Sequence, residues 1–485
     1  MHRLLYISTI AADLGDIFFF IAPLTAVPLI VTVLFAEWSL LLPMAAVPVI
    51  FLILGTALKQ LPRNVHENRL STALCSVALF WFACAMVSGI PFMLGLDMSF
   101  TDAFFEGMAG WTGTAFTMMR SLDLAPYTLL FWRSYMQWIG GIGIIAYAIT
   151  LASSTGLFQG KFYRKESREE PLMPSIISTG RAIWKIYAFL TFIALGLILF
   201  TGLSLWDSVN LALTTISTGG FVIHDGGILA YNNVFLELLL IPIMIAGALP
   251  FRLYYLITEN RRWSFFGDDQ VKLFLFVAGI GTAVLAYDLV FFGNTEIPVA
   301  LMQGLFMSVS ALTTTGFQIA NIQMWESVTL LFLLMLVFIG GSAGSTSGGI
   351  KLNRVVLGFR SLIWWFRRLF VSGKVLIPFK SEGRIIPRAT AELETAKTML
   401  VIILSVIVIF VATLVIIQFH LTLFSITDVI FDVTSAFSTC GITSGYVSPD
   451  MPFISKWVFI VVMWIGRLEV IPVLMLFIAL FRGSD

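Results

Sequence analysis

Long apolar stretches separated by short polar segments run along the whole chain. About twenty apolar residues can cross a bilayer as a helix, because a helix rises ~1.5 Å per residue and the hydrocarbon core is about 30 Å thick. The pattern predicts ten such spans, two near the N-terminus and then four pairs. They lie near 17–36, 38–58, 71–94, 127–151, 183–203, 234–256, 271–292, from 328 onward, 399–419 and 453–481.

A shorter segment occurs once between the two spans of each later pair. Aligned without gaps, the copies are TDAFFEGMAGWTGTAF (101–116), WDSVNLALTTISTGGF (206–221), MQGLFMSVSALTTTGF (302–317) and TDVIFDVTSAFSTCGI (427–442). An amphipathic run of roughly ten residues is too short to cross the membrane. Non-helical backbone at membrane depth is tolerated only where it lines a cavity or is buried in protein. The copies therefore predict four re-entrant hairpins whose glycine-containing ends converge on one axis.

These repeats predict an all-α polytopic membrane protein with pseudo-fourfold symmetry around one central pore. Four tandem helix–pore-loop–helix repeats follow two N-terminal transmembrane helices. The predicted divisions are an N-terminal helix pair with its loop at 1–69 and pore repeats at 70–160, 161–262, 263–388 and 389–485.

Composition agrees with a membrane protein and argues against an enzyme. Hydrophobic residues make up 58% of the chain and charged residues 12%, about half the charge of a soluble domain. The three cysteines lie in apolar or repeat segments, which argues against a disulfide framework or a metal cluster. The chain contains no HExxH motif. We expect no catalytic residues, no organic cofactor and no nucleic-acid partner.

The positions of basic residues predict the orientation in the membrane. Of the 29 Lys and Arg, all but Arg120, Arg133, Lys456 and Arg467 lie near the N-terminus, in four loops or at Arg482. Cytoplasmic loops are enriched in Lys and Arg, so both termini are predicted in the cytoplasm and the repeats open outward. The outer side carries mainly Asp and Glu, which would concentrate cations there or cap the repeat helices.

The glycine-containing ends of the repeats are candidates for a cation filter. Backbone carbonyls around an axis can replace the hydration shell of a monovalent cation, and glycine permits the positive φ that turns carbonyls inward. A simple helix-packing role would not require four copies in one register. The predicted K⁺-binding residues are Thr112, Gly113, Thr114, Ala115, Ser217, Thr218, Gly219, Gly220, Thr313, Thr314, Thr315, Gly316, Ser438, Thr439, Cys440 and Gly441.

Several motifs resemble the Trk/Ktr/HKT superfamily of potassium transporters, most of all its Trk-type uptake subunits, TrkH and TrkG. They are STGGF, TTTGF, FWRSYMQWIGGIGII (131–145), FIGGSAGSTSGGIK (338–351) and WIGRLEV (464–470). The resemblance implies potassium uptake across the plasma membrane of a bacterium (its inner membrane) or an archaeon. It also implies a homodimer and a cytosolic TrkA-type nucleotide-binding ring that regulates opening.

Ala115 departs from this resemblance, because the family usually has glycine there. A Cβ atom makes a positive φ costly by roughly 1–2 kcal/mol, so either one carbonyl is misdirected or the local backbone differs. Sodium or mixed conduction is therefore an alternative to potassium selectivity. Another alternative is symport coupled to H⁺ or Na⁺, for which Glu237 and Asp432 are the candidate titratable groups.

The stretch GGSAGSTSGG at 340–349 interrupts the second span of the third repeat. So much Gly and Ser cannot hold a stable helix, and broken helices at membrane depth mark transport paths. The sequence around Lys351 does not form a phosphate-binding loop. By resemblance, this stretch plugs the pore beneath the filter. The predicted gating residues are Gly340, Gly341, Gly344, Ser345, Gly348, Gly349 and Arg467.

Arg467 and the 351–388 segment are the remaining charged features. Intramembrane charges are usually paired, so Arg467 is predicted either to hydrogen-bond carbonyls of the 340–349 loop or to contact Glu469. The 351–388 segment carries nine basic residues, which suit anionic lipid headgroups or, by resemblance, the regulatory ring. For Arg133, Gln137 and Trp138 we predict only packing or anchoring at the interface.

Overall fold

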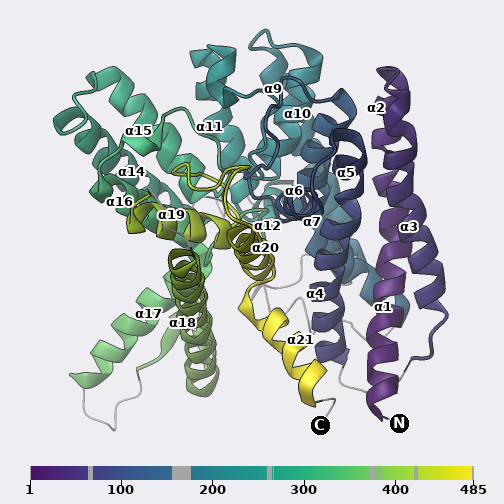
Figure 1. The fold of residues 1–485 in the computed structure, drawn as a ribbon. Coiled ribbons are helices and arrows are strands. Elements are labelled where there is room, and N and C mark those ends of the chain that lie inside the picture. The colour runs from purple at the N-terminus through teal and green to yellow at the C-terminus, as the bar shows by residue number, and fades with distance from the viewer. Residues whose placement is uncertain are drawn as a thin grey trace.

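The computed structural model describes residues 2–63, 69–155, 176–258, 265, 267–370, 377–381, 384–419 and 424–482. The described part is helical apart from one short antiparallel hairpin, β1 (Phe379–Ser381) with β2 (Arg384–Ile386), which the hydrophobic pattern does not predict. Figure 1 shows both termini at the same end of the molecule.

The N-terminal pair of helices packs through glycine. The helix α1 (His2–Thr25) lies against α3 (Leu41–Lys59), and α2 (Pro28–Leu34) extends α1 beyond a break before Pro28. A Cβ atom on Gly15 would lie 2.5 Å from the backbone nitrogen of Lys59, and one on Gly55 would lie 2.6 Å from the backbone nitrogen of Phe19. Glycine therefore allows the two backbones to approach closely.

Each of the four repeats places a short helix between longer ones. The short helices are α6 (Phe100–Thr112), α10 (Leu205–Ile216), α15 (Ile297–Leu312) and α19 (Ile426–Phe437). The helices that precede them are α4 (Arg69–Ser88) with α5 (Ile90–Leu96), α9 (Ile176–Leu199), α14 (Asp269–Phe291) and α18 (Arg388–Gln418). The helices that follow them are α7 (Tyr127–Thr155), α11 (Val234–Ala248) with α12 (Phe251–Thr258), α16 (Ser327–Ile339) with α17 (Leu352–Leu369), and α20 (Phe453–Leu468) with α21 (Val470–Arg482).

Six of the described helices are long and apolar enough to cross a membrane, and two bent pairs bring the number to eight. The places of the other two predicted spans are taken by α7 and by α16, which has 13 residues. Apolar side chains of α18 such as Ile403, Val406 and Phe410 are more than half exposed. This is expected of a lipid-facing helix, because its apolar side chains lie in hydrocarbon and its backbone hydrogen bonds are satisfied within the helix.

Three of the four second helices are broken, whereas the sequence predicts a break only in repeat 3. In repeat 3, α16 ends before Gly340 as expected. In repeat 2, α11 and α12 meet at 94°, because Pro250 cannot donate a backbone hydrogen bond and favours an extended Leu249. In repeat 4, α20 and α21 meet at 106° around Glu469, whose φ is 61°.

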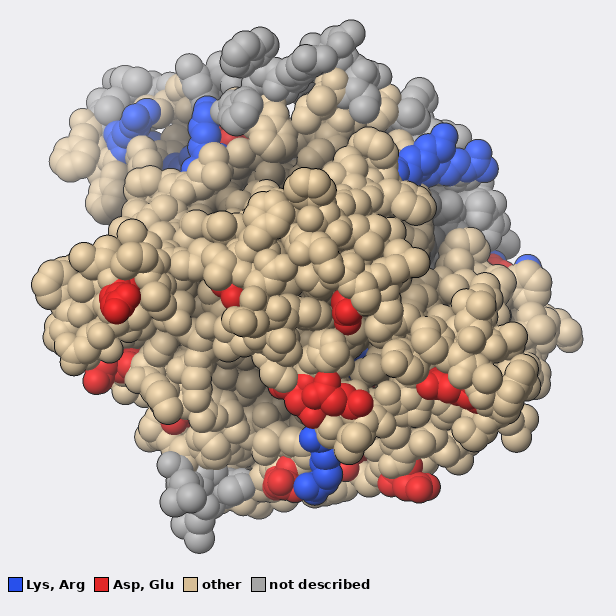
Figure 2. Space-filling view, turned by 90° about the horizontal axis from the view of Figure 1, so that it is seen from above, with Lys and Arg blue, Asp and Glu red and all other residues tan. Residues whose placement is uncertain are grey.

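The buried apolar residues form two large clusters that divide the repeats between them. One cluster joins the N-terminal helices mainly to repeats 1 and 4, and the other consists mainly of repeats 2 and 3 but includes Phe431, Cys440 and Ile442 of repeat 4. Seen from the end opposite the termini, acidic side chains are spread across the face and basic ones lie mostly near its margin (Figure 2). Acidic side chains therefore predominate over basic ones in the middle of this face.

Candidate functional site

Three of the four short helices begin with a serine cap, whereas α15 begins after Glu296 without a side-chain cap bond. The side chains of Ser99, Ser204 and Ser425 accept hydrogen bonds from the backbone N–H groups of Asp102, Asp207 and Asp428. The sequence suggested that the aspartates themselves are the caps. They instead occupy the third helical position, where a carboxylate still favours the positive end of the helix dipole.

The C-termini of the short helices lead into four segments, 112–115, 217–220, 313–316 and 438–441, which we call the ring segments. Their second residues all have positive φ: Gly113 at 72°, Thr218 at 49°, Thr314 at 54° and Thr439 at 50°. Positive φ is rare for a β-branched residue and marks positions held by their surroundings. The sequence placed this conformation only at the glycines of the fourth position, where φ is 76°, 91° and 90°.

The ring segments contact one another in the order of the repeats. A Cβ atom on Gly220 would overlap the Thr315 carbonyl oxygen, and one on Gly316 would overlap the Cys440 carbonyl oxygen. One on Gly441 would overlap the backbone of Ala115. A Cβ atom on Gly113 would lie 3.8 Å from the Gly219 Cα. The four segments therefore form a closed ring, in which glycine is required at 220, 316 and 441 because the neighbouring backbone leaves no room for a side chain.

Ala115 breaks the symmetry of this ring. It is not among the residues with positive φ, and its backbone N–H donates to the Cys440 carbonyl at 3.2 Å. Cβ atoms placed on Gly220, Gly316 and Gly441 would lie 3.0, 2.9 and 2.6 Å from the Ala115 Cβ. The methyl group thus points toward all three other segments and occupies space near the axis of the ring.

The 340–349 stretch, which we call the glycine loop, lies against one side of the ring. The Gly348 N–H donates to the Thr314 hydroxyl at 2.8 Å, and the Thr218 hydroxyl donates to Thr346 at 3.1 Å. A Cβ atom on Gly348 would overlap the Ser438 carbonyl oxygen. The loop therefore contacts ring segments from repeats 2, 3 and 4.

Arg467 is attached to the glycine loop and to repeat 1. Its guanidinium donates to the Thr346 carbonyl at 3.0 Å and to the carbonyls of Gly140 and Gly141 at 2.7 and 3.2 Å. Glu469 instead binds Arg354 and lies 3.6 Å from Lys351. Of the two predicted arrangements, the geometry corresponds to the contact with the loop, because the broken helix at Glu469 turns the two side chains apart.

Comparison with known proteins adds to this geometry. A family model described as TrkH, cation transport protein, matches residues 44–483. The chain therefore belongs to the TrkH family. An uncharacterized cation transporter of Methanocaldococcus jannaschii is 32% identical over 477 residues, which cover 96% of this chain and 94% of that protein. The Trk system potassium uptake protein TrkH of Escherichia coli K12 is 30% identical over 428 residues, 84% of each chain.

A solved structure of the family has the same fold. The crystal structure of the potassium transporter TrkH from Vibrio parahaemolyticus matches with a TM-score of 0.79 and 26% identity, and covers 95% of this chain and 98% of that chain. The resemblance inferred from the motifs and the all-α polytopic fold are thereby confirmed. TrkH-family proteins transport cations and are not enzymes. The roles of individual ring and loop residues stay predictions.

Three polar residues of repeat 1 support the ring, although the sequence predicted no such role for them. Gln137 donates to the Gly219 carbonyl at 2.7 Å and accepts from the Phe221 N–H at 3.0 Å. Arg133 pairs with the fully buried Glu106, with 2.5 Å between Nε and Oε1. Polar residues inside an otherwise apolar span of a TrkH-family protein are the signal that could have identified them.

An outer histidine joins three segments on the face opposite the termini. His224 contacts Asp123 through Nδ1 at 2.8 Å and Asp207 through Nε2 at 3.2 Å. Partial burial of the ring lowers its pKa, but the hydrogen bonds and negative charges of the two aspartates outweigh this, so the pKa of His224 is raised.

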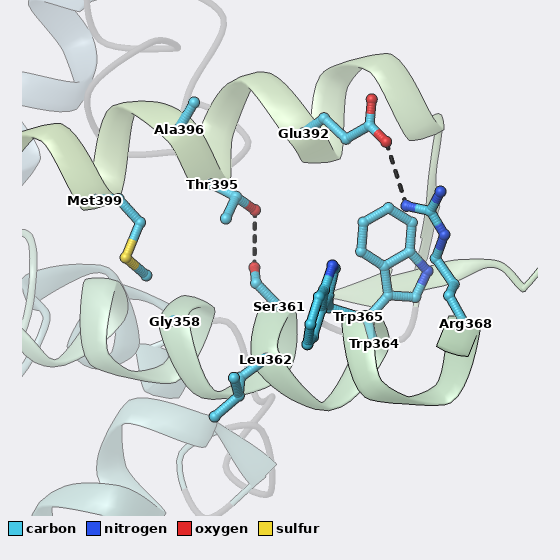
Figure 3. A pocket seen from close by; sticks show the side chains of 10 residues that line it. All are labelled: Gly358, Ser361, Leu362, Trp364, Trp365, Arg368, Glu392, Thr395, Ala396 and Met399. Carbon is cyan, nitrogen blue, oxygen red and sulfur yellow. Dashed lines mark hydrogen bonds and ion pairs between the residues drawn. The ribbon is translucent and has the colours of Figure 1, made fainter. Parts of the chain in front are cut away.

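A pocket of about 520 Å³ lies between α17 and α18, in the basic segment. Figure 3 shows Arg368 directed at Glu392 and Ser361 hydrogen-bonded to Thr395 among the residues that line it. The Arg368 guanidinium also lies over the Trp364 ring. Because the charge of Arg368 is met by Glu392, the pocket itself carries no strong attraction for an anion.

Proposed function

We propose that this chain is a gated potassium uptake subunit of the plasma membrane. The closed ring of four backbone segments carries the proposal, because such a ring can replace the water around a monovalent cation. The Escherichia coli relative named as a potassium uptake protein supports potassium as the ion. The ring residues 112–115, 217–220, 313–316 and 438–441 form the filter. The glycine loop and Arg467 form the gate.

Cation flux into liposomes that contain the purified protein tests this proposal. Rb⁺ uptake should be saturable, inhibited by K⁺, and inhibited much less by Na⁺ or Li⁺. Liposomes with Gly316→Val should show no uptake, because the added side chain would overlap the Cys440 carbonyl of the next segment. Uptake that is equal in protein-free liposomes would refute the proposal.

Sodium or mixed conduction is a second candidate, and one observation favours it. The Ala115 N–H engages the Cys440 carbonyl, so this oxygen is less available to a cation, and the Ala115 methyl narrows the ring. Ala115→Gly removes the methyl group and permits the positive φ that the fourth residues of the other three segments adopt. If this turns the N–H away from Cys440, the preference for K⁺ over Na⁺ should increase by up to about tenfold, the factor for one hydrogen bond of ordinary strength. An identical preference in both proteins would show that Ala115 does not set selectivity.

Coupled symport is separated from passive conduction by reversal potentials. Passive conduction predicts a reversal potential that follows the K⁺ gradient alone, whereas symport predicts a shift when the H⁺ or Na⁺ gradient is changed. Glu237 is buried in the first turn of α11, and Glu237→Gln should abolish such a shift if this residue carries the coupling.

The proposed partners are a second copy of the chain, a cytosolic TrkA-type nucleotide-binding ring and membrane lipids. Both termini lie at one end of the molecule (Figure 1), and the basic segment supports a cytoplasmic position for this end. The helix α17 leaves a large apolar surface exposed beside its arginines, which suits the membrane interface. Its exposed residues include Phe359, Leu362, Ile363, Trp365, Phe366 and Leu369.

A further inference from the structure

Two buried carboxylates occupy the same place in different repeats. Glu106 is the sixth residue of the first copy and Asp432 the sixth residue of the fourth, whereas the other two copies have Leu211 and Met307 there. Both acidic side chains are fully buried. A buried carboxylate is costly unless its oxygens are hydrogen-bonded, so the contacts of these two decide what they do.

Glu106 binds the chain just beyond the first ring segment. It accepts hydrogen bonds from the Thr117 hydroxyl at 3.1 Å and from the Met118 N–H at 2.8 Å. Thr117 lies two residues after Ala115. One side chain thus connects the short helix α6 to the non-helical chain at 117–118, just beyond the first ring segment.

Asp432 makes the same connection in repeat 4. It accepts from the Thr443 hydroxyl at 2.7 Å and from the Ser444 N–H at 2.7 Å. In both repeats the threonine follows the acid by 11 residues and the N–H by 12. The Ser444 hydroxyl and the Val447 N–H add two further bonds to Asp432, each at 3.0 Å.

The two carboxylates differ in their charge partners. Arg133 neutralises Glu106 at 2.5 Å. Among the described residues, the contacts of Asp432 are neutral donors only. Two of them are backbone N–H groups, which can only donate, and this donor set suits the ionised carboxylate, which can only accept. Asp432 therefore places a net negative charge beside the ring.

The other two repeats hold their ring segments with neutral groups. Gln137 binds Gly219 and Phe221 in repeat 2, and the Ser310 hydroxyl donates to the Phe317 carbonyl at 2.7 Å in repeat 3. The carboxylate supports thus belong to repeats 1 and 4. These repeats meet at the contact between Ala115 and Cys440.

We propose that Glu106 and Asp432 are positioning residues of the filter, and that Asp432 also supplies negative charge that favours cations in it. Each hydrogen-bonds the chain just beyond a ring segment, at 117–118 or 443–444, to the short helix that precedes that segment. This role rests on the proposed function, because it requires the ring to be the filter. Low local dielectric strengthens both effects, since both carboxylates are fully buried.

Competition between Rb⁺ and Na⁺ for uptake into liposomes tests this role. Asp432→Asn keeps the shape of the side chain but removes the charge and one acceptor, and it should lower the preference for Rb⁺ at least about tenfold. Thr443→Val should act in the same direction, and Thr443→Ser, which keeps the hydroxyl, should restore the preference. A purely structural role would change the amount of folded protein and the maximal uptake without changing this ratio.

Asp428→Asn is the matched control, because Asp428 lies on the same helix and the amide oxygen of asparagine can still accept from the Ser425 N–H. It should retain the wild-type preference. If Asp432→Asn does not fold, the two Thr443 variants decide the question. Unchanged preference in Asp432→Asn or, failing that, in Thr443→Val would overturn the proposal. Wild-type liposomes that take up no Rb⁺ would instead refute the proposed function.

Discussion

Replacement of Arg467 by alanine tests the gate most directly. The guanidinium donates to three backbone carbonyls, of which only that of Thr346 belongs to the glycine loop. The other two belong to Gly140 and Gly141 on α7. The variant therefore removes one charged hydrogen bond that holds the loop in place against the ring.

The magnitude follows from this single bond. A hydrogen bond to a charged group contributes about 1.5–3 kcal/mol, and each 1.4 kcal/mol changes an equilibrium about tenfold. The ratio of open to closed protein should thus rise about 10- to 150-fold in Arg467→Ala. Loss of the positive charge beside the path adds to the current, because it removes a repulsion for cations.

Macroscopic currents in excised patches without cytosolic proteins measure this ratio. Currents are divided by the amount of protein in the membrane, determined by labelling. Arg467→Lys should give an intermediate increase, because lysine keeps the charge but lacks the planar fork of donors. Arg120→Ala is the control, since its ion pair with Asp450 is exposed and contributes little. Equal currents in Arg467→Ala and wild type would show that the loop is not held by this residue.

Three further predictions concern stability, pH dependence and the gate. Arg133→Met leaves Glu106 buried without its charge partner and should cost about 3–5 kcal/mol of unfolding free energy, seen as a lower thermal midpoint in detergent; a midpoint equal to that of Arg120→Met would contradict this. The raised pKa of His224 predicts that its ion pairs with Asp123 and Asp207 are formed below pH 6.5 and are lost as the pH rises through that raised pKa. Hydrogen exchange of residues 221–233 should therefore quicken with pH beyond its intrinsic increase in the wild type but not in His224→Gln. Thr346→Val removes bonds to Gly247, Ile216 and Thr218 and should raise the open fraction in the patch assay, whereas Thr346→Ser should not.

The spans, the four short helices and the break before Gly340 could be predicted from the sequence because the membrane restricts the choices. A segment of 12 to 16 residues with a polar end cannot cross a bilayer, so its hairpin form follows from its length. The bends at Pro250 and Glu469 were missed. Pro250 does lie in an apolar run where proline could have been weighed as a break, but the turn at Glu469 depends on its tertiary ion pairs.

The conformation of the ring itself was only partly predictable. Glycine at the fourth position of three segments is visible in the sequence, but the positive φ of Thr218, Thr314 and Thr439 is not. Threonine does not favour this conformation, so it is imposed by the packing of the four segments together. The bond from Ala115 to Cys440 joins residues more than 300 positions apart, and no local pattern indicates it.

The repeats are alike in backbone and unlike in what holds the backbone, and this explains the position of Arg467. The glycine loop is hydrogen-bonded to repeat 2 through Thr346 and to repeat 3 through Gly348, and it packs on repeat 4 at Ser438. Its hydrogen-bonded link to repeat 1 runs through Arg467, which binds the loop with one side of its guanidinium and α7 with the other. A guanidinium can bind the Thr346 carbonyl of the loop and the Gly140 carbonyl of α7 at once. Each of these charged hydrogen bonds is about twice as strong as one from a neutral side chain. The loop therefore contacts all four repeats, and its hydrogen-bonded link to repeat 1 is the one that we expect Arg467→Ala to break.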